Sequence, residues 1–120
     1  MINRKKGNLI VYISLLVGAA LMHTGCGDPL DRNMQMRDLD DPDVSIRIMA
    51  IKWASENKRT DAVPQLVNLL QNEDRSVRFY AIQGLKQITG TDNGFDYRAD
   101  PVSRADAVKR WQKFIESDKQ

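Results

Sequence analysis

Twice in this chain the sequence runs from an Asp to an Ile through one pattern, first as Asp43-Val44-Ser45-Ile46-Arg47-Ile48-Met49-Ala50-Ile51 and then as Asp74-Arg75-Ser76-Val77-Arg78-Phe79-Tyr80-Ala81-Ile82. Asp, Ser, Arg, Ala and Ile recur in register, and the positions between them largely keep their apolar or polar class. The shift between the copies is about one helical hairpin, which is in the range of solenoid repeats. We therefore expect a tandem helical repeat.

Each copy begins with the features of a helix start. Asp43 and Asp74 are expected N-caps, because a carboxylate there accepts from the free N–H groups of the first turn. Apolar residues three and four apart then predict a helix to about Asn57, with the stripe Ile46, Met49, Ala50, Trp53 and Ala54. In the second copy the stripe is Val77, Ala81, Ile82, Leu85 and Ile88, and Gly90 provides a left-handed stop.

Two further helices complete the pattern. One is expected to be capped by Thr60 or Asp61, to have Pro64 in its first turn, and to bury Val63, Leu66, Val67 and Leu70. The last follows the loop 91–99, is capped by Asp100 or by Ser103 with Asp106, and has the apolar side Val108, Trp111, Phe114 and Ile115. Short turns favour antiparallel neighbours. The predicted fold class is all-α, an α-α superhelix (solenoid) of two helical hairpins with about four helices.

The pattern Asp-x-x-(Ile/Val)-Arg-x-x-Ala at 43–50 and 74–81, with Ala62-Val63-Pro64-Gln65-Leu66 between the copies, resembles the short HEAT repeats of bilin-lyase-like proteins. The resemblance covers roughly Leu39 to Ile88, and it implies a curved helical stack that binds other proteins and carries no chemistry. In that family the Arg and Asp residues pair between neighbouring repeats, which implies structural roles for Asp43, Arg47, Asp74 and Arg78. Ala50 and Ala81 are expected to be points of close contact between helices. The segment 89–97, with Arg104, Ala107 and Arg110-Trp111, is similar to an ending that closes some bacterial HEAT-repeat proteins.

The first residues have the layout of a secretory signal peptide, with a basic start at Arg4-Lys5-Lys6 and an apolar run over 9–22 that is short for a membrane span. Thr24-Gly25-Cys26 resembles the lipobox of bacterial lipoproteins, in which the Cys is diacylated and becomes the mature N-terminus. His23 departs from that pattern, which has an aliphatic residue there. The alternatives are cleavage after Gly18-Ala19-Ala20, which leaves Cys26 as a free thiol, or an uncleaved anchor.

These features divide the chain into a signal peptide (1–25), a lipidated Cys26 with an acidic tether (26–40) and a repeat domain (41–120). Leu30, Met34 and Leu39 in the tether region could form a short helix that covers the open end of the first repeat.

Composition excludes several classes of site. The formal net charge is +2, and without the three basic residues of the signal the remainder is close to neutral, which argues against nucleic-acid binding. Cys26 and His23 are the single residues of their kinds, so an intrachain disulfide and a His/Cys zinc site are excluded. Asp92, Asn93, Asp96 and Asp100 do not have the spacing of a calcium-binding EF-hand loop. We expect no catalytic residue, no metal and no cofactor.

The predicted function is a membrane-anchored protein-interaction or scaffold module of the cell envelope, not an enzyme, with a protein partner and no small-molecule substrate. It would be exported and lipid-anchored to the inner or outer membrane of a bacterium. Two hairpins leave apolar surface at their ends, so the contact region is predicted at the loop Asp92–Asp100 and at Arg110, Trp111 and Lys113. The alternative is an enzyme accessory that handles a chromophore, as a bilin-lyase-like protein would.

Overall fold

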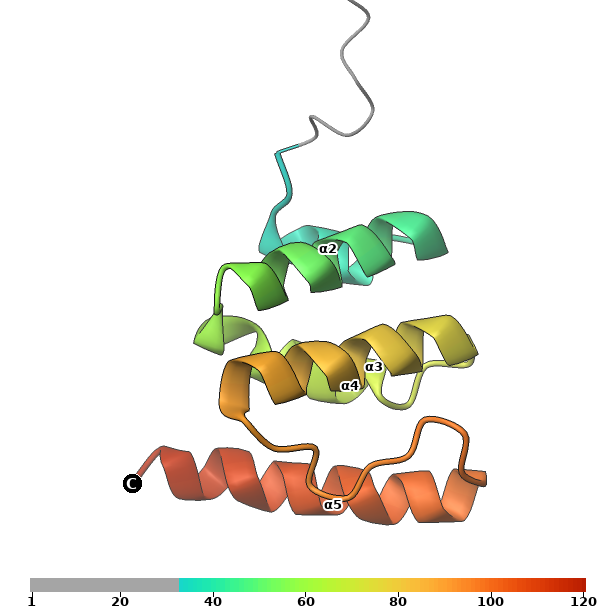
Figure 1. The fold of residues 1–120 in the computed structure, drawn as a ribbon, viewed down its shortest axis with the longest axis vertical. Helices are drawn as coiled ribbons and strands as arrows, with labels where there is room; N and C mark the ends of the chain where they lie inside the picture. Colours follow the sequence, from blue (N-terminus) through green and yellow to red (C-terminus); the bar gives the residue numbers. More distant parts are fainter. Residues whose placement is uncertain (1–32) are drawn as a thin grey trace, which may run out of the picture. The chain divides into compact units, whose positions relative to one another are not determined.

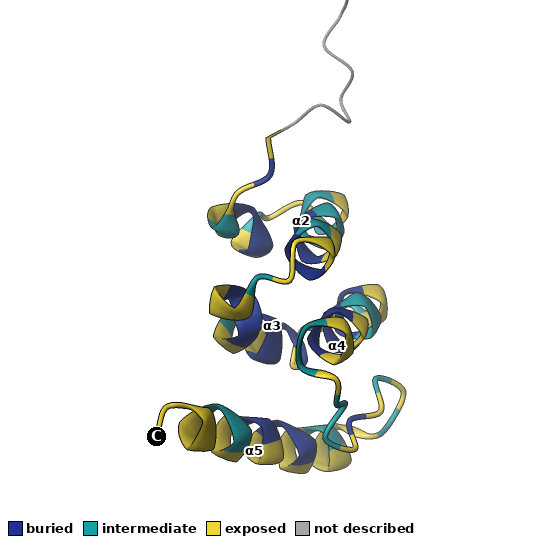
Figure 2. Ribbon diagram, turned by 60° about the vertical axis from the view of Figure 1, so that its left-hand side comes forward, coloured by how far each residue is buried: buried dark blue, intermediate teal, exposed yellow. Residues whose placement is uncertain are grey.

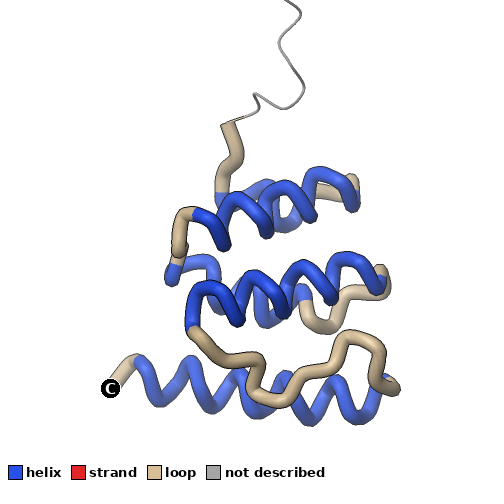
Figure 3. Tube along the Cα trace, viewed as in Figure 1, coloured by secondary structure: helices blue, strands red, loops and turns tan. Residues whose placement is uncertain are grey.

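The computed structural model describes residues 33–120. The predicted signal peptide, Cys26 and Leu30 lie outside these residues. The described part contains four α-helices, α2 (Val44–Glu56), α3 (Val63–Leu69), α4 (Arg75–Thr89) and α5 (Pro101–Asp118), and the two 3-10 helices η1 (Met36–Asp40) and η2 (Thr60–Ala62). No strand occurs among the described residues, as Figure 3 shows. The all-α prediction is confirmed.

The helices form layers along a stack (Figure 1). η1 lies beside α2, α3 lies beside α4, and α2 stacks on α4. The sequence instead predicted a hairpin between α2 and α3. That pairing is wrong because the short loop after α3 folds α4 back against it, whereas the turn after α2 carries the chain into the next layer. In the last layer α5 packs against α3, and the loop 91–99 crosses beneath α4 (Figure 2).

The repeated Asp residues cap their helices as predicted. Asp43 Oδ1 accepts from Ser45 N at 2.7 Å, and Asp74 Oδ1 accepts from Ser76 N at 2.7 Å. The turn before each cap is also repeated, because the Asp41 and Asn72 side chains accept from the backbone N–H two residues later, each at 2.9 Å. The two copies therefore share the turn as well as the helix.

A third copy of the motif begins α5. Asp100 precedes Pro101 and accepts from Val102 N and Ser103 N, so the first of the two predicted caps is the correct one. The spacing Asp-x-x-x-Arg-x-x-Ala recurs at Asp100, Arg104 and Ala107. Arg104 Nη1 donates to the carbonyl oxygen five residues before it at 2.6 Å, as Arg78 Nη1 does in α4 at 2.8 Å. The last layer is therefore a divergent repeat.

The start of α3 differs from the prediction. Neither Thr60 nor Asp61 caps α3, since η2 precedes the helix and its N-cap, Ala62, has no side-chain acceptor. Asp61 accepts instead from the Arg59 guanidinium at 2.6 and 2.9 Å, and this hydrogen bond lowers the pKa of Asp61. Pro64 lies in the first turn, where its missing N–H costs little.

The core lies between the layers, where the buried residues are dark blue in Figure 2. Ala50 and Ala81 are fully buried, which fits their expected close-contact roles, and the predicted stripe of α3 is also buried. The stripe of α2 is shifted, because Ile51 is buried while Ile46, Met49 and Trp53 are half-buried. Buried residues also include Met34 and Leu39, so the compact unit begins at Met34 and not at 41.

Close approach of α2 to α4 explains the shifted stripe. A Cβ atom at Gly84 would overlap Ser55 Oγ and would lie 3.3 Å from Ile51 Cγ2. Because Gly84 has no side chain, α2 turns Ile51 and Ser55 toward α4, and the Ser55 hydroxyl is satisfied by the Ile51 carbonyl at 2.6 Å.

Candidate functional site

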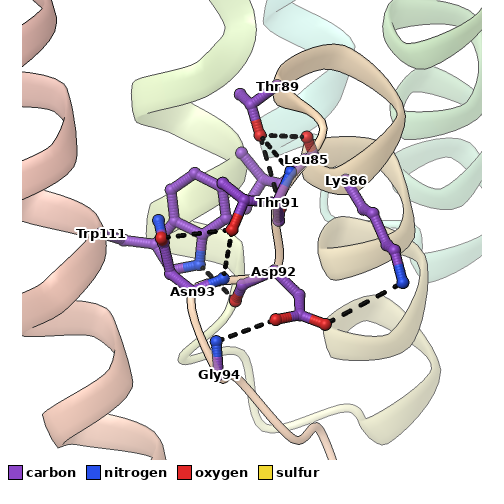
Figure 4. Close-up of polar contacts among 8 residues, drawn as sticks. All are labelled: Leu85, Lys86, Thr89, Thr91, Asp92, Asn93, Gly94 and Trp111. Atoms are coloured by element: carbon purple, nitrogen blue, oxygen red, sulfur yellow. Dashed lines mark hydrogen bonds and ion pairs between the residues drawn. The ribbon is translucent and has the colours of Figure 1, made fainter.

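Trp111, one of the predicted contact residues, is fully buried. Its indole Nε1 donates to the Asp92 carbonyl oxygen at 3.2 Å (Figure 4), and its ring meets Phe114 edge-on with centroids 5.4 Å apart. The prediction that Trp111 contacts a partner is wrong, because the ring fills the space between α5 and the loop. Trp111 is a core residue.

Arg110, which is exposed, donates hydrogen bonds to the same loop. Its Nε donates to the Asn93 carbonyl at 2.9 Å and its Nη2 to the Gly94 carbonyl at 3.2 Å. Asn93 and Gly94 have φ values of 47° and 70°, a conformation that needs support at a non-glycine residue. Arg110 thus has a structural role, while Lys113 is exposed and its role in partner binding stays a prediction.

Each carboxylate of the loop region has its own hydrogen-bond donors, and among the described residues no donor is shared between them. Asp92 Oδ1 accepts from Gly94 N at 2.9 Å, and its other oxygen lies 4.0 Å from Lys86 Nζ (Figure 4). Asp96 accepts from Arg98 N, and this hydrogen bond lowers the pKa of Asp96. Hydrogen bonds from the Ser103 hydroxyl and N–H lower the pKa of Asp100. Within residues 33–120 no group of three His, Cys, Asp or Glu side chains is arranged to hold a metal ion.

The repeated arginines bind backbone carbonyls. Arg78 is 7% exposed, and its Nη1 donates to the carbonyls of Asn72 and Glu73 at 2.8 Å each. Its Nε donates to the Tyr97 carbonyl at 3.2 Å. Burial lowers the pKa of Arg78, as does repulsion from Arg104 and Arg75. The Arg–Asp pairing implied by the family resemblance is therefore wrong for Arg78, whose partners are the turn of its own repeat and the next layer.

Surface aromatic residues gather at one edge of α4 and the loop. Phe79 meets Tyr80 and Tyr97 edge-on, with ring centroids 5.2 and 5.0 Å apart. The guanidinium carbons of Arg75 and Arg98 lie 5.5 and 5.4 Å from the centroid of the Tyr97 ring, which is cation–π distance. We call these five residues the aromatic–arginine face. All three rings are half-buried and both arginines are exposed.

The aromatic and cationic character of this face is not part of the repeat pattern. The first repeat has Val44, Ile48 and Met49 at the positions of Arg75, Phe79 and Tyr80. Tyr80 and Tyr97 pack against the core, whereas Phe79 packs on the two tyrosines. This face was not predicted from the sequence, because the prediction rested on the positions that the two copies share. The signal was in the positions at which they differ.

An apolar hollow of about 300 Å³ lies between the start of α3 and the ends of α4 and α5, where Ile88, Phe114 and Ile115 are half-buried. Its charged lining residues are Asp118 and Lys119, one of each sign. Some apolar surface is thus present at the C-terminal end, as predicted, but no charge pattern there selects a ligand.

A family model described as HEAT repeats matches residues 36–109. Comparison with curated proteins found no match, and neither did comparison with solved structures. None of the helices in the described part of the chain has the length and apolar character needed to cross a membrane.

Proposed function

The chain belongs to the HEAT-repeat family, and we propose that it is a non-catalytic module that binds another protein of the cell envelope while a lipid on Cys26 holds it at a membrane. HEAT repeats are generally protein-interaction modules, which supports the first part. The observation that carries it is the aromatic–arginine face, in which Arg75, Phe79 and Arg98 lie outside the core of the repeats. Exposed Arg and half-exposed Tyr and Phe are the composition of interface hot spots.

The anchoring part of the proposal is supported by the sequence alone. A basic start, an apolar run and Thr24-Gly25-Cys26 precede the first described residue. Stable anchoring requires two acyl chains or an equivalent second signal, which diacylation of Cys26 would supply.

Partner binding is tested by site-specific crosslinking in the cells that make the protein. A photoreactive amino acid replaces Tyr80, Lys113 or Asn68 in turn, the last being an exposed α3 position that serves as the control. We expect a discrete covalent adduct from Tyr80 or Lys113 and none from Asn68. Absence of an adduct from both Tyr80 and Lys113 contradicts the proposal.

Anchoring is tested by intact-mass spectrometry and membrane flotation. We expect an acylated Cys26 at the mature N-terminus, and we expect Cys26→Ser to leave the membrane fraction or to stay unprocessed. An unmodified Cys26 in the mature protein contradicts the anchor. A chromophore-handling protein would instead carry visible absorption after purification, and the same preparation shows whether it does.

A further inference from the structure

The aromatic–arginine face contains two guanidinium groups that are held in place without a strong ionic partner. Arg98 Nε lies 3.4 Å from Asp96 Oδ1, with both side chains more than half exposed. The Arg75 guanidinium has no hydrogen bond or ion pair within the described residues; its close contact is the Tyr97 ring, and its charge interacts with that of Asp96. Stacking on a ring leaves the N–H groups of a guanidinium free along its edge, in the geometry that suits a carboxylate.

The apolar part of the face lies beside these arginines. A shallow hollow of about 280 Å³ is lined by Arg75, Ser76, Phe79, Tyr80 and Tyr97. Phe79 contributes a half-buried ring that the core does not require. A ligand that fits this place therefore needs an apolar group for the hollow and an anionic group for the arginines.

Neighbouring charges also favour an anion. Asp74 and Asp100 cap helices, and Asp96 accepts from the Arg98 backbone. Arg75 and Arg104 lie close enough to Arg78 to repel its charge. The carboxylates of Asp74 and Asp100 are thus engaged at their own helix starts, whereas that of Asp96 also faces Arg98 and interacts with the charge of Arg75. Asp96 is one exposed carboxylate beside two arginines, so a second carboxylate from outside would balance the remaining positive charge.

We propose that the aromatic–arginine face binds an acidic protein segment, whose carboxylate accepts from Arg75 and Arg98 while an adjacent apolar side chain packs on Phe79. This rests on the proposed interaction function and adds the chemistry of the partner. A protein segment fits better than an anionic membrane surface, because membrane patches use clusters of about four to eight Lys and Arg residues. Here two exposed arginines lie beside Asp96.

The test uses the full chain in detergent micelles and a short synthetic peptide with a leucine between two glutamates. The matched control peptide has glutamine in place of each glutamate. We expect saturable binding of the acidic peptide by fluorescence anisotropy, with roughly tenfold weaker binding of the glutamine peptide, since a charge-assisted hydrogen bond contributes enough for such a factor. Equal affinity for the two peptides overturns the proposal.

Three variants locate the site. Arg75→Gln and Arg98→Gln should each weaken binding several-fold, and so should Phe79→Ile, which installs the residue found at this position in the first repeat. Lys109→Gln removes one positive charge from an exposed site on α5 and should leave the affinity unchanged. Helical circular dichroism verifies that each variant is folded. An equal loss of affinity in Lys109→Gln means bulk charge attraction and overturns the proposal.

Two outcomes separate this inference from the proposed function. Binding to vesicles that contain anionic phospholipid, without binding to the acidic peptide, makes the face a membrane contact and overturns the inference. A partner crosslinked from Lys113 whose capture survives Arg75→Gln and Arg98→Gln leaves the interaction function standing and shows that the docking surface is elsewhere.

Discussion

The two repeats place the same arginine in different surroundings. Arg78, in the second repeat, is 7% exposed and donates to the three carbonyls of Asn72, Glu73 and Tyr97. Arg47, in the first, is half-buried, and its Nε is buried with no hydrogen-bond partner within the described residues. The motif thus fixes the position of the arginine, and the following layer determines whether its hydrogen bonds are completed. Four measurements test this and other differences between the copies of the repeat.

Loss of Arg78 should have the largest effect. Arg78→Met keeps the length of the side chain but leaves three part-buried carbonyls without this charged donor, and we expect a loss of about 3 kcal/mol of unfolding free energy. Arg47→Met should cost less than about 1 kcal/mol, because fewer interactions are removed. Guanidinium denaturation followed by circular dichroism measures both. Equal losses would mean that the loop 91–99 does not secure Arg78.

Gly84 offers a second comparison between the repeats, because the equivalent position in the first repeat is Trp53. Gly84→Ala should destabilise by about 1–3 kcal/mol through overlap with Ser55 Oγ. In a Ser55→Ala background the same change should be nearly neutral or should stabilise by up to about 1 kcal/mol, the helix-propensity gain of Ala over Gly. A thermodynamic double-mutant cycle gives the coupling. A cost that is the same in both backgrounds would show that Ser55 is not the obstacle.

Removal of the N-cap should have similar effects on stability in the two repeats. Asp74 accepts from two backbone N–H groups, of Ser76 and Val77, whereas Asp43 accepts from that of Ser45. Replacing either by Ala should cost about 1 kcal/mol, with the larger value at Asp74. Thermal unfolding of the two variants under one condition gives the order. A larger loss at Asp43 would contradict the hydrogen-bond pattern.

The third copy of the motif supplies a test by pH. Hydrogen bonds from Ser103 lower the pKa of Asp100 from its ordinary value of 3.8. A depressed folded-state pKa stabilises the fold above the unfolded value, and this stabilisation is lost as the pH falls through the folded-state pKa. The difference in stability between the native protein and Asp100→Asn should therefore be present at neutral pH and shrink below pH 3.8. A difference that is constant across this range would contradict it.

Local features were predictable from the sequence because the residues that make them are neighbours in the chain. Asp43, Asp74 and Gly90 satisfy backbone groups or adopt dihedral angles within a few residues of themselves. Periodicity also identified the buried side of α3. The buried stripe of α2 is shifted to Ile51 because Gly84 of α4 leaves space there, and the sequence pattern within α2 does not indicate this.

Candidate sites were harder to predict, because exposure depends on which segment covers which. Trp111 is of a residue type common at interfaces, yet it is fully buried and its indole N–H donates to the loop carbonyl of Asp92. The aromatic–arginine face joins Arg75 and Phe79 of α4 to Tyr97 and Arg98 of a loop, and only the path of that loop beneath α4 brings them together. The pairing of α3 with α4 was missed for a similar reason, since it depends on the direction of a turn.

The three capping turns have a consequence for how such a chain can lengthen. Each Asp-x-x-x-Arg-x-x-Ala motif builds its turn from its own residues, and each layer meets the next through small or apolar side chains such as Ala50, Ala81 and Ala107. An extra copy inserted before Asp74 would bring its own cap and its own face for both neighbours. α5 and the loop before it would still cover the last layer. Duplication of one repeat in the gene would therefore add one layer to the stack without changes at either end.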